Sequence, residues 1–126
     1  MNTPTELKYS KSHEWVQELE NGKVRIGLTD YAQQELGDIV FVNLPGVGDE
    51  LTVGEACADV ESVKAVSDIY SPVSAVVSAV NEALLDAPEL INADCYDAWL
   101  LEADEVTQRE ELLGAEDYEA FVAEGA

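Results

Sequence analysis

The sequence predicts a mainly β domain with one short inserted helix and two short helices at its C-terminal end. Three observations support this prediction: short apolar segments alternate with turn residues, β-branched residues fill many of those segments, and helical spacing of apolar side chains is confined to short stretches. We expect a single domain over residues 1–126, because no linker or low-complexity run divides the chain. Its β core should cover about residues 7–103 and its C-terminal helices about residues 107–124.

The N-terminal third has the pattern of strands joined by tight turns. Asn21-Gly22 is a pair that tolerates the positive φ angles of a tight hairpin, so the segments on either side should pair. Strand patterns lie at residues 7–9, 14–16, 24–28 and 39–42.

One helix is expected within this β region. Residues 30–36 have helical character, Thr29 or Asp30 can cap their start, and Gly37 can end them in the left-handed conformation. Residues 46–55 instead alternate turn residues with short apolar pieces, so we expect no helix there.

The next strands are marked by β-branched and small residues. Residues 73–80 have this composition, and Ser71-Pro72 should separate them from the preceding strand. An irregular stretch is expected to open at residues 86–88, and a last strand at residues 99–101.

Two helices are predicted at the C-terminal end. Thr107 and Glu110 have capping-box spacing, which predicts a short helix ending at Leu113. After Gly114, residues 115–123 place apolar side chains at helical spacing, which would lay an apolar stripe on the sheet.

The chain is strongly acidic. It contains six Lys and Arg residues and 27 Asp and Glu residues, which gives a formal net charge of −21. Such a charge repels nucleic acid phosphates and anionic membranes, so both are excluded as expected partners. We interpret the acidity as adaptation to high salt, the alternative being an acidic docking face for basic partners.

Cysteine usage and the N-terminal residues bear on compartment. Cys57 and Cys95 lie far apart, without a Cys-x-x-Cys pair or a nearby histidine, so we expect free thiols and no metal site. Residues 1–10 contain no apolar or Arg-rich targeting pattern, and no window reaches the length of a membrane span. A cytoplasmic location is therefore expected.

Conventional catalytic motifs are not found. His13 is the sole histidine, and a lone histidine without triad partners is more often a packed structural residue than a general base. At this abundance of carboxylates, pairs of them are expected by chance and favour no acid–base site. Trp15 and Trp99 are interpreted as core residues. We therefore expect a protein that is not an enzyme.

Lys64 is the most informative residue. It lies between two strand patterns, where a turn would hold its amine in solvent, in a chain with very few basic residues. Such a lysine is suited to covalent attachment of a group that must move freely. Its flanking residues are Glu61, Ser62, Val63 and Ala65.

The sequence around Lys64 resembles the lipoyl and biotinyl carrier superfamily. Biotin carriers usually place methionines on both sides of the lysine, whereas Val63 and Ala65 stand here. Over nearly its full length the chain resembles the H proteins of the glycine cleavage system. The matching segments are Lys8-Tyr9, Ser12-His13-Glu14-Trp15-Val16, Ile26-Gly27-Leu28-Thr29-Asp30-Tyr31-Ala32-Gln33, Leu36-Gly37-Asp38-Ile39-Val40-Phe41-Val42, Glu61-Ser62-Val63-Lys64-Ala65, Ser67-Asp68-Ile69-Tyr70-Ser71-Pro72-Val73-Ser74 and Leu112-Leu113-Gly114.

This resemblance implies a flattened barrel-sandwich hybrid of antiparallel sheets, with lipoate in amide linkage to Lys64. It implies a carrier that shuttles an aminomethyl group and reducing equivalents between enzymes. The implied partners are a pyridoxal-phosphate glycine decarboxylase, a folate-dependent aminomethyltransferase, a flavin-containing dihydrolipoyl dehydrogenase and a lipoate-attaching enzyme. Ser12, Glu14 and Asp68 match positions near a cleft for the loaded arm, where Glu14 and Asp68 would attract its ammonium group or serve only as solvated charges.

The chain departs from the family pattern at two places. Ala75 stands where the family usually has glycine, so the bend there must suit a residue with a β-carbon. The segment from Asn92 to Trp99 lacks the family's usual proline before Tyr96 and is one residue shorter before Trp99, which leaves the shape of that loop open. Two other functions remain possible: a lipoate-relay or oxoacid-type lipoyl carrier, or an unmodified interaction protein with the same fold.

Overall fold

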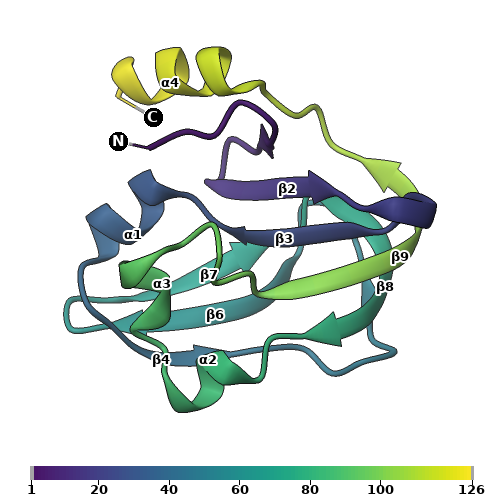
Figure 1. The fold of residues 1–126 in the computed structure, drawn as a ribbon, viewed down its shortest axis with the longest axis horizontal. Helices are drawn as coiled ribbons and strands as arrows, with labels where there is room; N and C mark the ends of the chain where they lie inside the picture. The colour runs from purple at the N-terminus through teal and green to yellow at the C-terminus, as the bar shows by residue number, and fades with distance from the viewer. Residues whose placement is uncertain (1, 126) are drawn as a thin grey trace.

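The computed structural model describes residues 2–125 and contains two antiparallel sheets (Figure 1). The larger sheet has the strand order β1-β2-β3-β9-β8-β5, and the smaller has the order β4-β6-β7. The strands of the larger sheet are β1 (Lys8–Tyr9), β2 (Glu14–Glu18), β3 (Val24–Leu28), β9 (Leu101–Arg109), β8 (Val73–Val80) and β5 (Glu50–Leu51). Those of the smaller sheet are β4 (Ile39–Asn43), β6 (Ala56–Ser62) and β7 (Val66–Tyr70). The predicted mainly β class is confirmed.

The helices are short and lie around the sheets. They are the 3-10 turn η1 (Glu20–Gly22), α1 (Asp30–Leu36), α2 (Ala83–Asp86), α3 (Leu90–Ala93) and α4 (Ala115–Ala123). Figure 1 shows α4 beside the N-terminal segment.

The predicted hairpin and helix form for the reasons the sequence gives. Asn21 and Gly22 adopt φ angles of 61° and 76°, which turn the chain between β2 and β3. The Thr29 side chain accepts a hydrogen bond from the Ala32 amide and caps α1, and Gly37 ends the helix at φ 78°.

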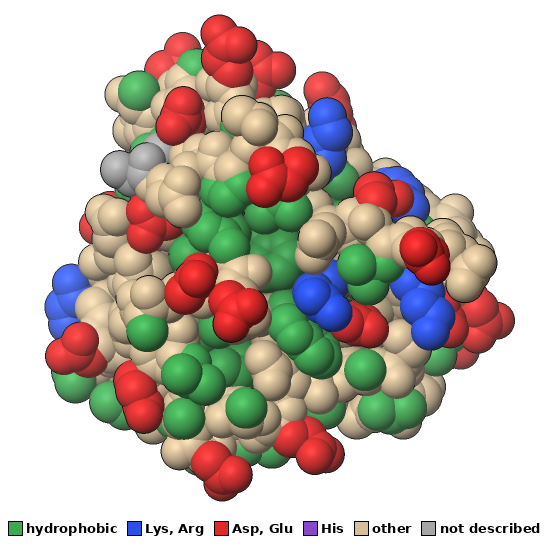
Figure 2. All heavy atoms as spheres, viewed as in Figure 1, with side chains coloured by type: hydrophobic (Ala, Val, Ile, Leu, Met, Phe, Trp, Pro, Cys, Tyr) green, Lys and Arg blue, Asp and Glu red, His purple; other side chains and the backbone are tan. Residues whose placement is uncertain are grey.

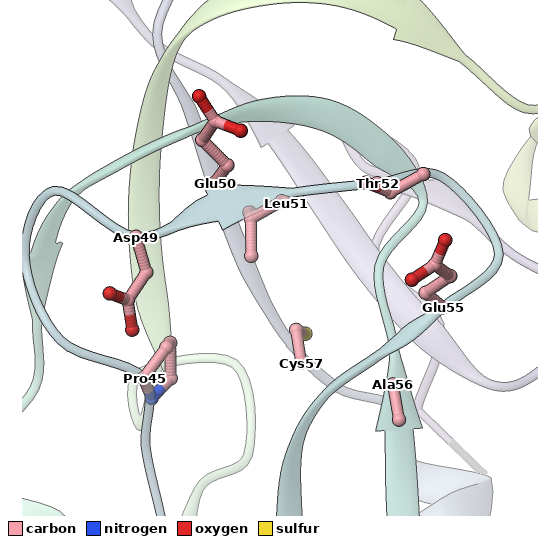
Figure 3. A pocket seen from close by; sticks show the side chains of 8 residues that line it. All are labelled: Pro45, Asp49, Glu50, Leu51, Thr52, Glu55, Ala56 and Cys57. Carbon is pink, nitrogen blue, oxygen red and sulfur yellow. The ribbon is translucent and has the colours of Figure 1, made fainter.

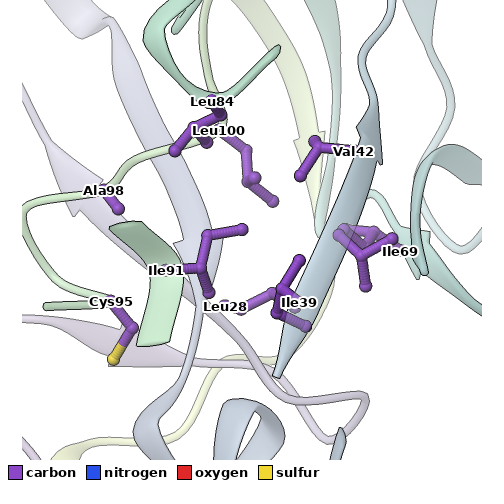
Figure 4. Close-up of a cluster of buried hydrophobic side chains, with 10 residues drawn as sticks. Leu28, Ile39, Val42, Ile69, Leu84, Ile91, Cys95, Ala98 and Leu100 are labelled. Carbon is purple, nitrogen blue, oxygen red and sulfur yellow. The ribbon is translucent and has the colours of Figure 1, made fainter. Parts of the chain in front are cut away.

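A buried cluster lies between the two sheets and is closed on one side by α2 and α3 (Figure 4). Burial of these side chains is the main force that holds the small sheet against the large one. The cluster comprises Leu28, Ile39, Val42, Val60, Ile69, Leu84, Ile91, Cys95, Ala98 and Leu100.

Trp15 anchors a further cluster, in which β1 and β2 lie under α4. It is fully buried, its ring nitrogen donates to the Cys95 carbonyl at 3.1 Å, and it faces Gly27 on β3. A β-carbon at residue 27 would lie 2.5 Å from the Trp15 ring, so this strand position requires glycine. The expectation that Trp15 is a core residue is confirmed.

The C-terminal prediction was wrong in one respect. Thr107 does not begin a helix, because β9 continues through Arg109 and pairs with β8, with Gln108 opposite Ser74. The β core therefore extends beyond residue 103, and α4 is the one helix described after β9.

The last strand begins at Leu101 rather than at Trp99. The stretch predicted to be irregular contains α3.

Both departures from the family pattern are accommodated locally. Ala75 lies in β8 opposite Leu51, at a register shift in the pairing of β8 with β9 between Ser74 and Val76, and its φ is not positive. The shorter segment forms a turn held by Asp94, whose carboxylate accepts from the amides of Tyr96 and Asp97 at 3.2 and 3.3 Å.

Candidate functional site

The β6–β7 hairpin holds Lys64 at its tip. Glu61 and Val66 form the last strand pair, and the Ser62 amide donates to the Ala65 carbonyl at 2.8 Å. The Ser62 hydroxyl accepts from the amides of Lys64 and Ala65, each at 3.1 Å. The lysine side chain is exposed. The tip is therefore a fixed turn from which a flexible amine extends.

A second segment braces this tip from outside. The amide of Val63 donates to the Asp38 carbonyl at 3.1 Å, in the loop between α1 and β4. The Lys64 stem passes close to Gly37 of the same loop. Figure 1 shows the hairpin reaching the edge of the molecule beside this loop. Sequence reasoning found Gly37 as a helix end but missed Asp38, because nothing local indicates a contact 25 residues away.

Glu14 forms a separate polar site. Only 1% of it is exposed, and its carboxylate accepts from the hydroxyls of Ser10 and Ser12 and from the Tyr70 amide. Burial raises the pKa of Glu14 to about 7, against the opposing effect of these hydrogen bonds. Neither ion pair found among residues 2–125 involves it. A buried carboxylate without a cation is suited to receive a positive charge.

The predicted cleft residues are only partly brought together. Ser12 and Glu14 are hydrogen-bonded, whereas Asp68 lies exposed on β7, opposite Asp59 of β6. Glu14 touches β7 at Tyr70, at the opposite end of the strand from the lysine turn. That strand is about 13 Å long at 3.3 Å per residue, so an arm on the hairpin must fold back along β7 to reach Glu14.

His13 has a structural role. Its Nδ1 lies 2.8 Å from the Tyr118 hydroxyl, and its ring packs against Phe121 of α4. Burial lowers the pKa of His13. Its φ of 75° lies in the left-handed region, which places the ring beneath α4.

A cavity of about 340 Å³ opens beside the start of β6 (Figure 3). It is lined by Pro45, Asp49, Glu50, Leu51, Thr52, Glu55, Ala56 and Cys57. Burial, reinforced by the charge of Glu14, raises the pKa of Cys57 to about 12, so this thiol is a poor nucleophile. The cavity lies at the far end of β6 from Lys64, the end at which Ala56 pairs with Tyr70.

Other classes of site find no support in the described chain. Across residues 2–125, no group of three or more potential metal-ligating side chains comes together. None of the helices described is long and apolar enough to cross a membrane. Cys57 and Cys95 are free thiols.

Comparison with known proteins identifies the family. The family model described as glycine cleavage H-protein matches residues 7–125. A glycine cleavage system H protein from Lachnoclostridium phytofermentans is 58% identical over 116 residues, covering 92% of this chain and 91% of that protein. One from Geobacillus kaustophilus is 55% identical over 128 residues, covering 99% and 100%.

A solved structure agrees with this assignment. The crystal structure of a glycine cleavage system H protein from Mycobacterium marinum superposes with a TM-score of 0.89 at 40% identity. The match covers 95% of this chain and 98% of that one. These matches show that the chain, which presents an exposed lysine on a braced hairpin, belongs to the glycine cleavage H-protein family.

Proposed function

We propose that this protein is the carrier of a glycine cleavage system and that it bears lipoate in amide linkage to Lys64. The observation that carries the proposal is the position of Lys64, exposed at the tip of a hairpin whose backbone is fixed by hydrogen bonds. An exposed primary amine fits the attachment of an acyl group of this kind. The protein acts as a carrier and not as a catalyst.

Attachment would use the Lys64 amine as the nucleophile. In its neutral form Nζ attacks the carbonyl carbon of an activated lipoyl donor, such as an acyl adenylate. A C–N bond forms, the activating group leaves with the bonding electrons, and Nζ loses a proton to solvent. Acylation removes the positive charge of Lys64 and leaves its flexible stem as a tether.

The lipoyl group, when bound, supplies a disulfide that takes up an aminomethyl group and returns as a dithiol for reoxidation. The enzymes we propose as partners are a pyridoxal-phosphate glycine decarboxylase, a folate-dependent aminomethyltransferase, a flavin-containing dihydrolipoyl dehydrogenase and a lipoate-attaching enzyme. The hairpin keeps the root of the tether fixed while its end visits each of them.

Glu14 is proposed to receive the ammonium of the loaded arm. It is buried without a cation among the described residues, and Ser12 orients its carboxylate. Asp68, exposed on β7, lies along the path of an arm that folds back over this strand. Faster hydrolysis of the loaded arm in Glu14→Gln would support this role, and an unchanged rate would remove it.

The acidity and the free thiols support two further parts of the proposal. We infer adaptation to high salt from the net charge of −21. We infer a cytoplasmic location because Cys57 and Cys95 are free thiols, the state that reducing compartments maintain.

Reconstitution of glycine-dependent carbon dioxide release tests the proposed function. Wild type, after lipoylation, should support turnover with the partner enzymes, and Lys64→Arg should not, since it keeps the charge but lacks a primary amine. Lys23→Arg, which makes the same change at another lysine, is the matched control and should retain activity. Equal turnover by Lys64→Arg and wild type would refute the assignment.

A further inference from the structure

Asn92 of α3 uses its side chain to hold the loop between α1 and β4. Its Nδ2 donates to the Gly37 carbonyl at 2.9 Å and to Gln33 Oε1 at 3.0 Å. Its Oδ1 accepts from the Ile39 amide at 2.8 Å. The side chain is half-buried, so these bonds are partly shielded from competing water.

These contacts enclose a short piece of chain. Gly37 and Ile39 are bonded on either side of Asp38, so both ends of this turn are tied to one amide group. Asn92 is itself seated by its neighbour Ile91, which is 1% exposed in the core between the sheets. Through Asn92 the turn is therefore anchored next to a residue of the buried core.

The same turn is the external brace of the lysine hairpin. The Asp38 carbonyl accepts from the Val63 amide at 3.1 Å, one residue before the modified position. A β-carbon at residue 37 would lie 3.3 Å from Lys64 Cε, so the lysine stem rests against the turn. A connected path therefore runs from Asn92 through the turn to the root of the arm.

We propose that Asn92 is a positioning residue for the modification of Lys64, which it serves by holding the Gly37–Asp38 turn against the hairpin. This inference rests on the proposed function, because it assumes that a lipoate-attaching enzyme must recognise the hairpin in one conformation. Without Asn92 the turn loses two hydrogen bonds, at Gly37 and Ile39, and α1 loses a third at Gln33, so the turn that supports the hairpin tip is held less firmly. The enzyme then meets the correct conformation in a smaller fraction of molecules, which weakens its apparent affinity for the carrier.

Two substitutions separate positioning from stability. Asn92→Ala removes all three bonds, and Asn92→Asp keeps the volume and the acceptor for Ile39 but replaces both donors with an oxygen that repels the Gly37 carbonyl. The matched control is Asn43→Ala on β4, which removes an exposed amide that bonds Asp59 on the same sheet. Each unmodified variant is assayed with a lipoate ligase, lipoate and ATP, at a temperature where it is folded by circular dichroism.

We expect KM for the carrier to rise about five-fold or more in both Asn92 variants, with little change in kcat, and to stay unchanged in Asn43→Ala. A small acylating reagent, the N-hydroxysuccinimide ester of acetate, should modify Lys64 at the wild-type rate in every variant, because it does not read hairpin geometry. Hydrogen exchange at the Val63 amide should quicken in the Asn92 variants. If both variants fold and are lipoylated with the wild-type KM, the inference is wrong.

A milder variant keeps the test open if the Asn92 variants unfold. Gln33→Ala removes one of the three contacts from the partly exposed helix α1 and should give a smaller rise in KM with faster Val63 exchange. No change in either would overturn the proposal. A wild-type protein that gains no lipoyl group would instead refute the proposed function, before any variant is compared.

Discussion

The stem of Lys64 lies against Gly37, so closely that a β-carbon at residue 37 would sit 3.3 Å from Lys64 Cε. Gly37 has φ 78° and ψ −153°, a combination that glycine alone adopts readily. Gly37 therefore both ends α1 and lies next to the Lys64 side chain. One glycine serves the fold and the site together.

Gly37→Ala should therefore impair both stability and modification. We expect the free energy of unfolding to fall by about 1–3 kcal/mol from backbone strain, measured by urea denaturation, and lipoylation of Lys64 to slow. Gly114→Ala is the control, because Gly114 has φ −72° and no atom within 4 Å of an added β-carbon. Equal losses in the two variants would contradict the special role of residue 37.

Glu14 should give stability a characteristic pH dependence. Its pKa is raised from 4.5 to about 7 by burial, so the folded protein binds its proton more tightly than the unfolded chain. Its contribution to stability is complete below about pH 4.5 and is lost as pH rises through 7.

Glu14→Gln removes this dependence. The free energy of unfolding of the variant, minus that of wild type, should increase by about 3 kcal/mol between pH 4.5 and pH 7. Urea denaturation at each pH measures this difference. The exposed Glu20→Gln makes the same change in net charge and serves as control. The same pH dependence in both variants would show that Glu14 is not the group responsible.

Tyr118 should stabilise the attachment of α4 to the domain. Its buried hydroxyl lies 2.8 Å from both His13 Nδ1 and Thr29 Oγ1, and its ring stacks on Tyr9 with centroids 4.8 Å apart. Tyr118→Phe keeps the stacking but loses both hydrogen bonds, so we expect about 1–2 kcal/mol of destabilisation in thermal unfolding. Tyr70→Phe, at an exposed ring, should change little, and a comparable loss there would argue against this account.

Salt should stabilise the folded protein. Figure 2 shows acidic side chains spread over one face with few basic ones among them, consistent with the net charge of −21. Raising KCl from about 0.1 M to about 1 M shortens the Debye length from about 10 Å to about 3 Å, which weakens the repulsion. The free energy of unfolding should therefore rise. Undiminished stability in dilute buffer would favour an acidic docking face instead.

Local sequence patterns predicted the elements whose causes are local. Asn21-Gly22 turns the chain, Thr29 caps α1 and Gly37 ends it. Thr107 shows where local reasoning fails: its capping-box spacing is real, but pairing of β9 with β8 outweighs a capping preference. The four-residue helices α2 and α3 are too short to show a helical period.

The site divides in the same way. Lys64 could be found from its flanking residues, because a tight turn between two strands is a local feature. Its brace could not be found, since Asn92 bonds residues 53 to 59 positions away and no periodicity marks it. Asp68 was grouped with Glu14 by resemblance, whereas strand alternation turns its side chain to the exposed face.

Mapping of the acylated residue shows whether Lys64 is the attachment site. The unmodified protein is incubated with lipoate ligase, lipoate and ATP, digested, and analysed by tandem mass spectrometry. We expect one lipoyl amide per chain, on Lys64, with Lys8, Lys11 and Lys23 unmodified. A lipoyl group on any of those three lysines, or none on Lys64, would contradict this assignment.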